Sequence, residues 1–530
     1  MKRIYTPTLL AFVVVIAVSC ADFLAEEPKS TISEDQYYKT PADALTAVNA
    51  TYYFYNAGGP NGSGQSAYNS LLQVGMEFAT DEQYPGPGAT NADVRSLSVH
   101  NHSSTNRTIY ENWQQHYAGI KKCNVAIEKI PQIDFGSNAA LQQRYLGEAK
   151  FNRAFIYFNI VRLWGDVPLI IENQNYVKAQ DYYVAKSAAT AVYAQIETDL
   201  IEASAVLPNT YSGGDLGRAT AGAAKALLAK VYLTKASFPL RLESHYQDAI
   251  VFAEQVLSPI DGGSGVFNYN LRRNYADVFL PALKNNEEHI FSAQYMSNFQ
   301  TQGRNDFFRT LPRFPSSFGI VGNYADQVNF YAKGADKSFS LYKLFKKSDK
   351  RRKVTFATLF VNPRNGAKFG SPIANPAFPG DSTPYFFKTY DPTAFASIPA
   401  EAATNVTLLR YAELLLIHAE AENELNGPTD KAYRSFNRIR NRAGLPDLTP
   451  GLSQSQFRDS LYLDRELELV YEYQRWFDLI RQRDAAGNPV FVEKLHAAGK
   501  INAVDRNRWF PIPQIELDNN PLLVQNDLWK

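Results

Sequence analysis

Helical periodicity is the feature of this 530-residue chain that most constrains its fold. Apolar side chains recur at three- and four-residue spacing over residues 40–55, 108–257 (with breaks) and 406–483, which is the pattern of amphipathic helices. The segment 144–163 carries one continuous apolar stripe and then meets Gly165, a residue type that commonly ends a helix. We therefore expect a mostly α-helical fold in which these helices pack on one another.

Two predicted helical hairpins repeat one pattern of small residues. In the first, Ala236 on one helix is followed 13 residues later by Ala249 on the next. In the second, Ala419 and Ala432 are 13 residues apart in the same way. Small side chains let two helices approach closely, as in tetratricopeptide-like repeats, although any antiparallel helix pair favours them at its crossing. The pattern predicts a scaffold of tetratricopeptide-like helical pairs.

Composition divides the chain further. Residues 258–405 are rich in Gly, Pro, Asn and aromatic residues and show little helical period, and residues 57–105 are similar. Long loops on a regular scaffold are where binding surfaces usually lie. We predict an N-terminal helical region over 31–257 that contains the loop excursion 57–105. A loop-rich, irregular ligand-binding insertion over 258–405 follows, and a C-terminal helical region over 406–530 completes the scaffold.

The first 20 residues have the form of a bacterial export signal. Two basic residues precede an apolar run from Leu9 to Val18, which is shorter than the about 20 residues needed to span a bilayer. Small residues then lead to Cys20, whose thiol is suited to lipid attachment. We predict a signal peptide over 1–19, lipidation of Cys20 and a lipidated acidic tether over 20–30, with an ordinary cleaved signal as the alternative.

Charge and cysteine content exclude several functional classes. Lys and Arg total 54 against 53 Asp and Glu, so the chain lacks the basic excess of nucleic-acid-binding proteins. If Cys20 carries lipid, Cys123 has no partner for a disulfide. The sequence contains no Gly-rich phosphate loop, no G-x-S-x-G motif and no paired cysteine motif. We expect no enzymatic activity, no cofactor and no nucleic-acid partner.

The segment Tyr462–Leu479 contains the two carboxylates that a catalytic acid and base would require. On a single helix, three- and four-residue steps place on one face Arg465, Glu468, Glu472 and Arg475. Flanking guanidiniums hold carboxylates ionised, whereas a general acid needs a raised pKa. We therefore expect a structural polar ladder and not a catalytic pair.

Two closely spaced histidines, with His116 farther along the chain, are candidates for a metal site. His100 and His102 are two residues apart, and alternate residues of an extended strand can both reach one metal ion. No Cys, Asp or Glu stands at short ligand spacing beside them, so we expect no metal site.

Aromatic and polar residues of the loop-rich regions predict a ligand surface. A sugar ring presents apolar C–H faces to aromatic rings, and its hydroxyls bind polar side chains at the rim. The alternative is that the loop aromatics fix the loops to the scaffold. The candidate ligand-binding residues are Asp81, Tyr84, Arg95, His102, Phe307, Phe308, Arg309 and Phe314.

Seven segments in order carry a family likeness. They are "SEDQYYKTPADALTAVNATY", "GEAKFNRAFIYFNIVRLWGDVPLI", "GRATAGAAKALLAKVYL", "LLRYAELLLIHAEAENELNG", "NRIRNRAGLP", "RELELVYEYQRWFDLIR" and "RWFPIPQIELDNNPLLVQN". Across nearly all of the mature sequence, the chain resembles the SusD/RagB family of outer-membrane nutrient-binding lipoproteins.

This resemblance implies a scaffold of tetratricopeptide-like pairs and a loop-rich ligand surface. It also implies a lipoprotein on the outer face of a Gram-negative outer membrane that works with a SusC-like TonB-dependent transporter. Most relatives bind oligosaccharides and some bind peptides. The matching segments lie in the scaffold, so they transfer no ligand residue. One partial exception is "ATDEQYPG", which is similar to the family's Asp-Glu segment near the binding face and favours Asp81 and Tyr84.

We therefore expect a non-enzymatic surface lipoprotein that captures an oligosaccharide and delivers it to the transporter. The alternatives are a peptide-binding import component of the same architecture, a surface glycoside hydrolase, and a helical scaffold that binds only other proteins. A glycan array and a peptide library separate the first two, and release of reducing ends from a polysaccharide would identify a hydrolase.

Overall fold

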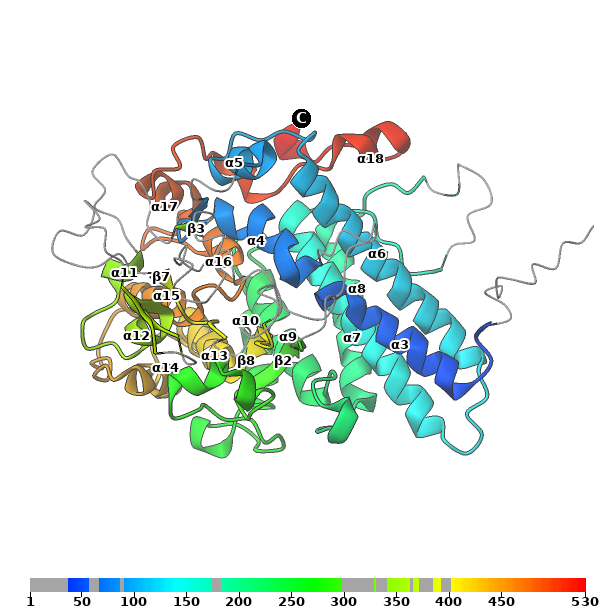
Figure 1. The fold of residues 1–530 in the computed structure, drawn as a ribbon, viewed down its shortest axis with the longest axis horizontal. Helices are drawn as coiled ribbons and strands as arrows, with labels where there is room; N and C mark the ends of the chain where they lie inside the picture. Colours follow the sequence, from blue (N-terminus) through cyan, green and yellow to red (C-terminus); the bar gives the residue numbers. More distant parts are fainter. Residues whose placement is uncertain are drawn as a thin grey trace, which may run out of the picture.

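The structure is a computed structural model that describes residues 37–56, 66–85, 90–173, 181, 183–296, 328–329, 341–362, 366–370, 385–391 and 402–530. Within these residues the fold is mostly helical, as predicted, with a few short two-stranded sheets. In Figure 1 the long helices of residues 41–164 lie on one side, and the helices of residues 411–497 lie with those of residues 341–355 on the other. The predicted signal peptide and tether lie outside the described residues.

The N-terminal region is a series of packed helices. They are α3 (Pro41–Asn56), α6 (Arg107–Lys129), α7 (Ala139–Trp164), α8 (Ala189–Val206), α9 (Ala221–Ala236) and α10 (His245–Glu254). Helix α3 packs on α6 and α7, and from α6 to α10 each helix packs on the next. Helix α7 begins where the Asn138 side chain accepts the Leu141 amide, and its residues from Phe151 to Trp164 are all buried. The predicted apolar stripe is therefore fully enclosed.

Gly165 ends α7, as predicted, and its conformation explains why glycine is needed there. Its φ is +74°, a backbone region that other residues rarely adopt. A Cβ atom at this position would also lie 3.2 Å from the ring of Trp509. The end of α7 thus depends on a close contact with the C-terminal segment.

The two predicted hairpins are present and stand next to each other. Helices α9 and α10 form the first hairpin, and α13 (Tyr411–Asn426) and α14 (Asp430–Ala443) form the second. Helix α10 also packs on α13, so the two pairs stack. The four alanines that defined the pattern are all buried at these contacts: Ala236, Ala249, Ala419 and Ala432.

Four further helices follow the second hairpin in the C-terminal region. They are α15 (Gln454–Leu469), α16 (Arg475–Arg481), α17 (Phe491–Ala497) and α18 (Gln514–Asn519). A capping box at Ser453 and Gln456 starts α15 by satisfying its first backbone amides. Helix α15 packs on α13, which makes α13 the central helix of this half of the molecule.

The excursion 57–105 is more helical, in its described part, than its composition indicates. It holds the π-helical turn η1 (Ala67–Leu71), α4 (Leu72–Gly75), the 3₁₀ turn η2 (Glu77–Ala79) and α5 (Ala92–Ser98). Other short 3₁₀ turns join the longer elements: η3 (Ile130–Gln132), η5 (Gly213–Asp215), η6 (Pro259–Asp261), η7 (Tyr275–Phe279), η8 (Pro281–Leu283), η13 (Asp505–Arg508) and η14 (Asp527–Trp529).

The described residues form four antiparallel strand pairs. They are β2 (His289–Ala293) with β8 (Val406–Arg410), β1 (Tyr84–Pro85) with β3 (Val328–Asn329), β4 (Phe356–Ala357) with β7 (Tyr385–Phe386), and β5 (Leu359–Val361) with β6 (Lys368–Gly370). Of these, β2–β8 and β1–β3 connect the variable region to the rest. The variable region also holds α11 (Leu341–Leu344) and α12 (Arg351–Thr355). The β2–β8 pair places His289 opposite Arg410, so the variable region leaves and rejoins the scaffold at one sheet.

Two hydrophobic clusters hold these parts together. The larger runs through the long helices, from α3 to α16. The smaller joins Phe78 of the excursion, Leu341 and Phe386 of the variable region, and Val470 after α15. No helix among the described residues is both long enough and apolar enough to span a bilayer.

Candidate functional site

Asp81 lies inside the protein and is paired with the C-terminal region. Arg475 at the start of α16 donates from Nε to Asp81 Oδ1 at 2.7 Å and from Nη2 to Oδ2 at 2.5 Å. Both side chains are buried. A bidentate guanidinium–carboxylate pair of this kind is strong and fixes orientation. Both carboxylate oxygens of Asp81 are therefore engaged, so the geometry favours a role in positioning the segment 77–85.

Other buried carboxylates surround the same arginine. Glu466 accepts from Arg475 Nη2 at 3.0 Å, and Glu77 and Glu82 are buried nearby. Burial raises the pKa of all three glutamates, and the charge of Arg475 only partly offsets it. One guanidinium thus serves several carboxylates, and the group as a whole favours bound protons.

A buried lysine fixes the backbone of the same segment. Lys500 Nζ donates to the carbonyl oxygen of Gln83 at 3.0 Å and also to that of Phe78. Burial lowers the pKa of Lys500 to about 7. The segment that carries Asp81 and Tyr84 is therefore held by side chains from the C-terminal region.

Tyr84 and Arg95 come close to the variable region. Tyr84 is half-buried in β1, where it pairs with Asn329 of β3. Arg95 is half-buried on α5, which packs against β1. Since β3 belongs to the residues 258–405, the β1–β3 pair joins the two loop-rich regions that the sequence indicated as a ligand surface.

His102 is buried among aromatic rings of the C-terminal segment. Its ring lies 5.2 Å from that of Trp529 and 6.1 Å from that of Phe510. His100 stacks on Trp476 and its Nε2 lies 2.8 Å from the Ala79 carbonyl oxygen. Burial lowers the pKa of His102 to about 4, so the ring is neutral at physiological pH. These contacts indicate that His102 packs against aromatic side chains in the interior.

The other candidate residues lie outside the described residues. They are Cys20, Phe307, Phe308, Arg309 and Phe314. Their assigned roles stay predictions.

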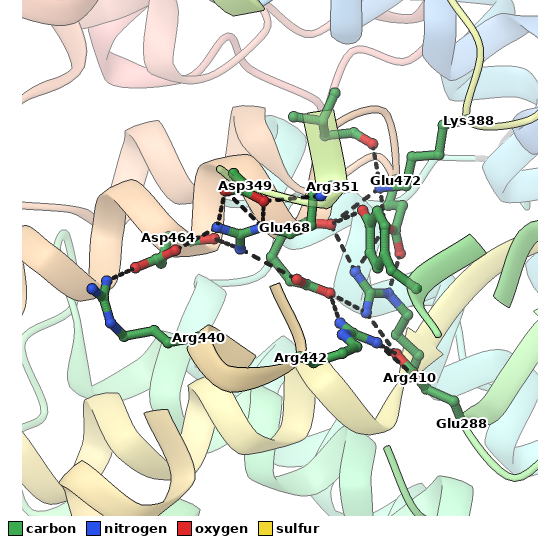
Figure 2. A network of polar contacts seen from close by, with 12 residues as sticks. Glu288, Asp349, Arg351, Lys388, Arg410, Arg440, Arg442, Asp464, Glu468 and Glu472 are labelled. Atoms are coloured by element: carbon green, nitrogen blue, oxygen red, sulfur yellow. Dashed lines mark hydrogen bonds and ion pairs between the residues drawn. The ribbon is translucent and has the colours of Figure 1, made fainter. Parts of the chain in front are cut away.

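A network of buried charges, which sequence reasoning did not find, connects the variable region to the scaffold (Figure 2). Five carboxylates face five cationic side chains within it. The carboxylates are Glu288, Asp349, Asp464, Glu468 and Glu472, and the cations are Arg351, Lys388, Arg410, Arg440 and Arg442. Glu288, Asp349, Arg351 and Lys388 belong to the variable region, whereas Asp464, Glu468 and Glu472 belong to the scaffold.

Arg410 at the end of β8 is the centre of this network. Its Nε donates to Glu472 Oε2 at 2.7 Å, and its Nη1 donates to Glu468 Oε1 at 2.6 Å and to Glu288 Oε1 at 2.9 Å. Lys388 Nζ reaches Glu472 Oε1 at 2.5 Å and the Val470 carbonyl at 2.8 Å. The balance of charges allows the group to be buried, because each ion has partners of opposite sign.

The predicted single helix over Tyr462–Leu479 is wrong. Helix α15 ends at Leu469 and α16 begins at Arg475, and between them Tyr471 and Tyr473 have φ of +60° and +59°. Positive φ is rare for a bulky residue and interrupts a helix. Both tyrosine side chains are buried, so tertiary packing maintains this conformation.

The predicted polar ladder therefore has different partners. Arg465 pairs with Asp478 and Glu413, and Arg475 pairs with Asp81, while Glu468 and Glu472 face Arg410. Burial alone would raise the pKa of Glu468, but the guanidiniums of Arg442, Arg410 and Arg351 outweigh it and hold the pKa well below its ordinary value. The prediction that these charges are structural and connect their segment to its neighbours is confirmed, and both glutamates stay ionised. Their partners, however, come from other elements and not from one helix face.

Among the described residues, one group of side chains has the composition of a metal site. Glu254, His418 and Glu422 bring one ligand atom each to within 4.8 Å of one another. The ammonium of Lys431 lies 2.7 Å from Glu254 and 3.9 Å from Glu422. This lysine already supplies a cation to both carboxylates.

A helical scaffold that carries a loop-rich variable region is typical of one class of protein, the helical binding proteins with variable loops. A model of the SusD family matches residues 251–529, and a second model, described as starch-binding associating with outer membrane, matches residues 23–233. The chain belongs to the SusD family. SusD-like glycan-binding proteins are non-catalytic, which confirms the expectation that the chain is not an enzyme.

Relatives match the chain over nearly its whole length. SusD-like protein P2 from Formosa agariphila is 27% identical over 540 residues, which cover 98% of each chain. A SusD superfamily protein from Parabacteroides distasonis is 28% identical with a TM-score of 0.74, covering 92% of this chain and 98% of that one. A laminarin-binding SusD-like protein is 25% identical with a TM-score of 0.72, covering 92% of this chain and 100% of that one.

Proposed function

We propose that this chain binds an oligosaccharide at the surface formed by its two loop-rich regions and delivers it to a SusC-like TonB-dependent transporter. The β1–β3 pair carries the proposal, because it joins Tyr84 of the excursion to the variable region that contains Phe307 and Phe308. A laminarin-binding protein of the same fold supports the choice of a glycan as ligand.

The scaffold supports this function by fixing the loops before a ligand arrives. Asp81 is held by Arg475, and Lys388 attaches the variable region to Glu472. Preorganised loops lose less conformational entropy on binding, so more of the stacking energy appears as affinity. In this proposal Asp81 positions Tyr84, and the aromatic side chains contact the sugar.

The anchor gives the binding protein its location. We propose that lipid on Cys20 holds it at the outer surface of the outer membrane, beside the transporter. A stable anchor of this kind needs more than one acyl chain.

Calorimetry with laminarin, followed by a glycan array, tests the ligand class. Tyr84→Ala and Phe308→Ala should each weaken glycan binding about two- to tenfold, the effect of losing roughly 0.5–1.5 kcal/mol of stacking. Tyr53→Ala is the matched control, because Tyr53 is an exposed tyrosine of α3 outside both loop-rich regions. Unchanged affinity in both test variants would remove these residues from the site.

A peptide library run in parallel separates the peptide-binding alternative. Binding of peptides without any binding on the glycan array would overturn the choice of ligand. Co-purification with a large outer-membrane barrel protein tests the partner, and failure to co-purify from a membrane extract would contradict it.

A further inference from the structure

An apolar cavity lies in the helical scaffold, apart from the loop-rich regions. It has a volume of about 200 Å³ and lies among the end of α7, the first turn of α8, the end of α9, helix α16 and Trp509. Its walls include Val161, Leu240, Phe477 and Ile480. None of the candidate glycan-binding residues in the described part of the chain lines it.

The buried guanidinium of Arg162 forms one wall of this cavity. It lies between two phenyl rings, 3.7 Å from the centroid of Phe158 and 3.6 Å from that of Phe477. Its Nε donates to the Phe158 carbonyl at 2.8 Å and its Nη2 to Asn159 Oδ1 at 2.8 Å. Its Nη1 has no hydrogen-bond acceptor in the described part of the chain.

Arg162 differs from every other buried arginine of the described residues, because it has no carboxylate partner. Its side chain is only 8% exposed. The others each form an ion pair: Arg153, Arg351, Arg410, Arg442, Arg458, Arg465, Arg475 and Arg481. The charges of Glu413 and Asp478 favour the charged form of Arg162 without an ion pair, and the two stacked rings offset a further part of the cost of its burial. Burial lowers the pKa of Arg162 to about 10, so it stays charged at neutral pH.

No other polar group on the described cavity wall forms an ion pair with Arg162, so its charge is available to a ligand. Arg481 is committed to Glu420 and Asp478. Asp166 accepts the Ala189 amide at 2.9 Å and makes no ion pair with Arg162. The Tyr193 hydroxyl, a second donor on the cavity wall, has no hydrogen-bond partner among the residues that the structure describes.

We propose that this cavity binds a small organic monocarboxylate with an apolar body, whose carboxylate accepts hydrogen bonds from Arg162 Nη1 and the Tyr193 hydroxyl. A carboxylate matches the charge and planar geometry of a guanidinium. The apolar walls match a hydrocarbon or aromatic body, and a cavity of about 150 Å³ is known to accept benzene. A sugar would leave its hydroxyls unpaired against these walls, so this site is distinct from the proposed glycan surface.

Two probes of the same shape test this proposal. The acid 3-phenylpropionate and its neutral analogue 3-phenylpropanamide are titrated into the purified protein by calorimetry and by ligand-observed NMR. The acid should bind roughly tenfold or more tightly than the amide, since only the acid gains a charge-assisted hydrogen bond.

Three variants locate the binding. Arg162→Gln should lower the affinity for the acid roughly tenfold or more, to that of the amide. Thr190→Trp places a large ring at the mouth of the cavity, where Thr190 is exposed, and should abolish binding of both probes. Arg273→Gln removes an exposed arginine elsewhere and should change nothing.

Equal binding of acid and amide would overturn the proposal, as would the absence of saturation up to about 10 mM acid. Circular dichroism checks the fold of each variant. If Arg162→Gln does not fold, Thr190→Trp decides: unchanged binding of the acid in that variant excludes this cavity.

Discussion

Replacement of Glu468 by Gln tests the buried charge network most directly. The carboxylate of Glu468 accepts from Arg410 Nη1 at 2.6 Å, from Arg351 Nη1 at 3.3 Å and from Arg442 Nη2. Glutamine has nearly the same shape, but its amide group must face at least one of these guanidiniums with an N–H. The variant therefore leaves a network of five cations with four carboxylates, buried and out of balance.

The expected loss of stability is large. Removing one partner of a buried ion pair costs about 3–5 kcal/mol, because the remaining charges stay buried without compensation. Urea denaturation of the wild type and the variant measures this difference, with the slope of the transition as a check that the unfolded states are comparable. Glu493→Gln is the matched control, since Glu493 is exposed on α17.

The pH dependence of the difference adds a second check. The pKa of Glu468 in the folded protein is held well below its ordinary value. Its contribution to the free energy of unfolding is therefore complete above the pKa of the unfolded chain, and it is lost as the pH falls through the pKa of the folded state. The difference between wild type and Glu468→Gln should stay constant from about pH 7 to 5 and narrow toward about pH 3. A loss below about 1 kcal/mol at neutral pH, equal to that of the control, would refute the reasoning.

Three further predictions follow from single residues. Burial raises the pKa of Glu77 to about 8, so the folded protein keeps a proton that the unfolded chain releases, and stability falls by up to about 1.4 kcal/mol per pH unit between about pH 4.5 and 8. Glu77→Gln should reduce the overall slope, to which Glu82 and Glu466 still contribute, and raise the thermal midpoint at pH 8 but not at pH 5. Parallel curves for the two proteins would contradict this. Gly165→Ala should lower the free energy of unfolding by about 1–3 kcal/mol in urea titrations, because Gly165 has a positive φ and a Cβ atom there would contact Trp509. Gly136→Ala is the control and should lower it less, because a Cβ atom at Gly136 meets no atom within 4 Å. Cys20→Ala should abolish retention at the cell surface, measured by antibody labelling of intact cells, while ligand affinity in solution stays the same. A variant that remains on the surface would show that Cys20 is not the anchor.

The helical pairs could be predicted because their signals are local. Ala236 and Ala249 are close in sequence, and the periodicity of each of their helices can be read from neighbouring residues. The end of α7 at Gly165 was equally local. These features need no knowledge of distant residues.

The break after Leu469 and the partners of Asp81 could not be predicted in this way. Tyr471 and Tyr473 adopt positive φ only because burial fixes their rings, and their residue type indicates the opposite. Asp81 and Arg475 are 394 residues apart, so no spacing connects them. The single helix over Tyr462–Leu479 was wrong for the same reason: the periodicity was real, but α15 ends between the charges.

The charge network limits how the variable region can be exchanged for another. Glu288, Asp349, Arg351 and Lys388 are the contribution of this region to a balanced set of ions, and the scaffold supplies the rest. A graft that replaced the whole region with neutral residues would remove Arg351 from Glu468, Lys388 from Glu472 and Glu288 from Arg410 and Arg442. Engineers who wish to change ligand specificity should therefore keep these four residues and the elements that carry them, and diversify the loops between them. New loops are therefore compatible with this scaffold only when they supply the ion-pair partners that its buried charges require.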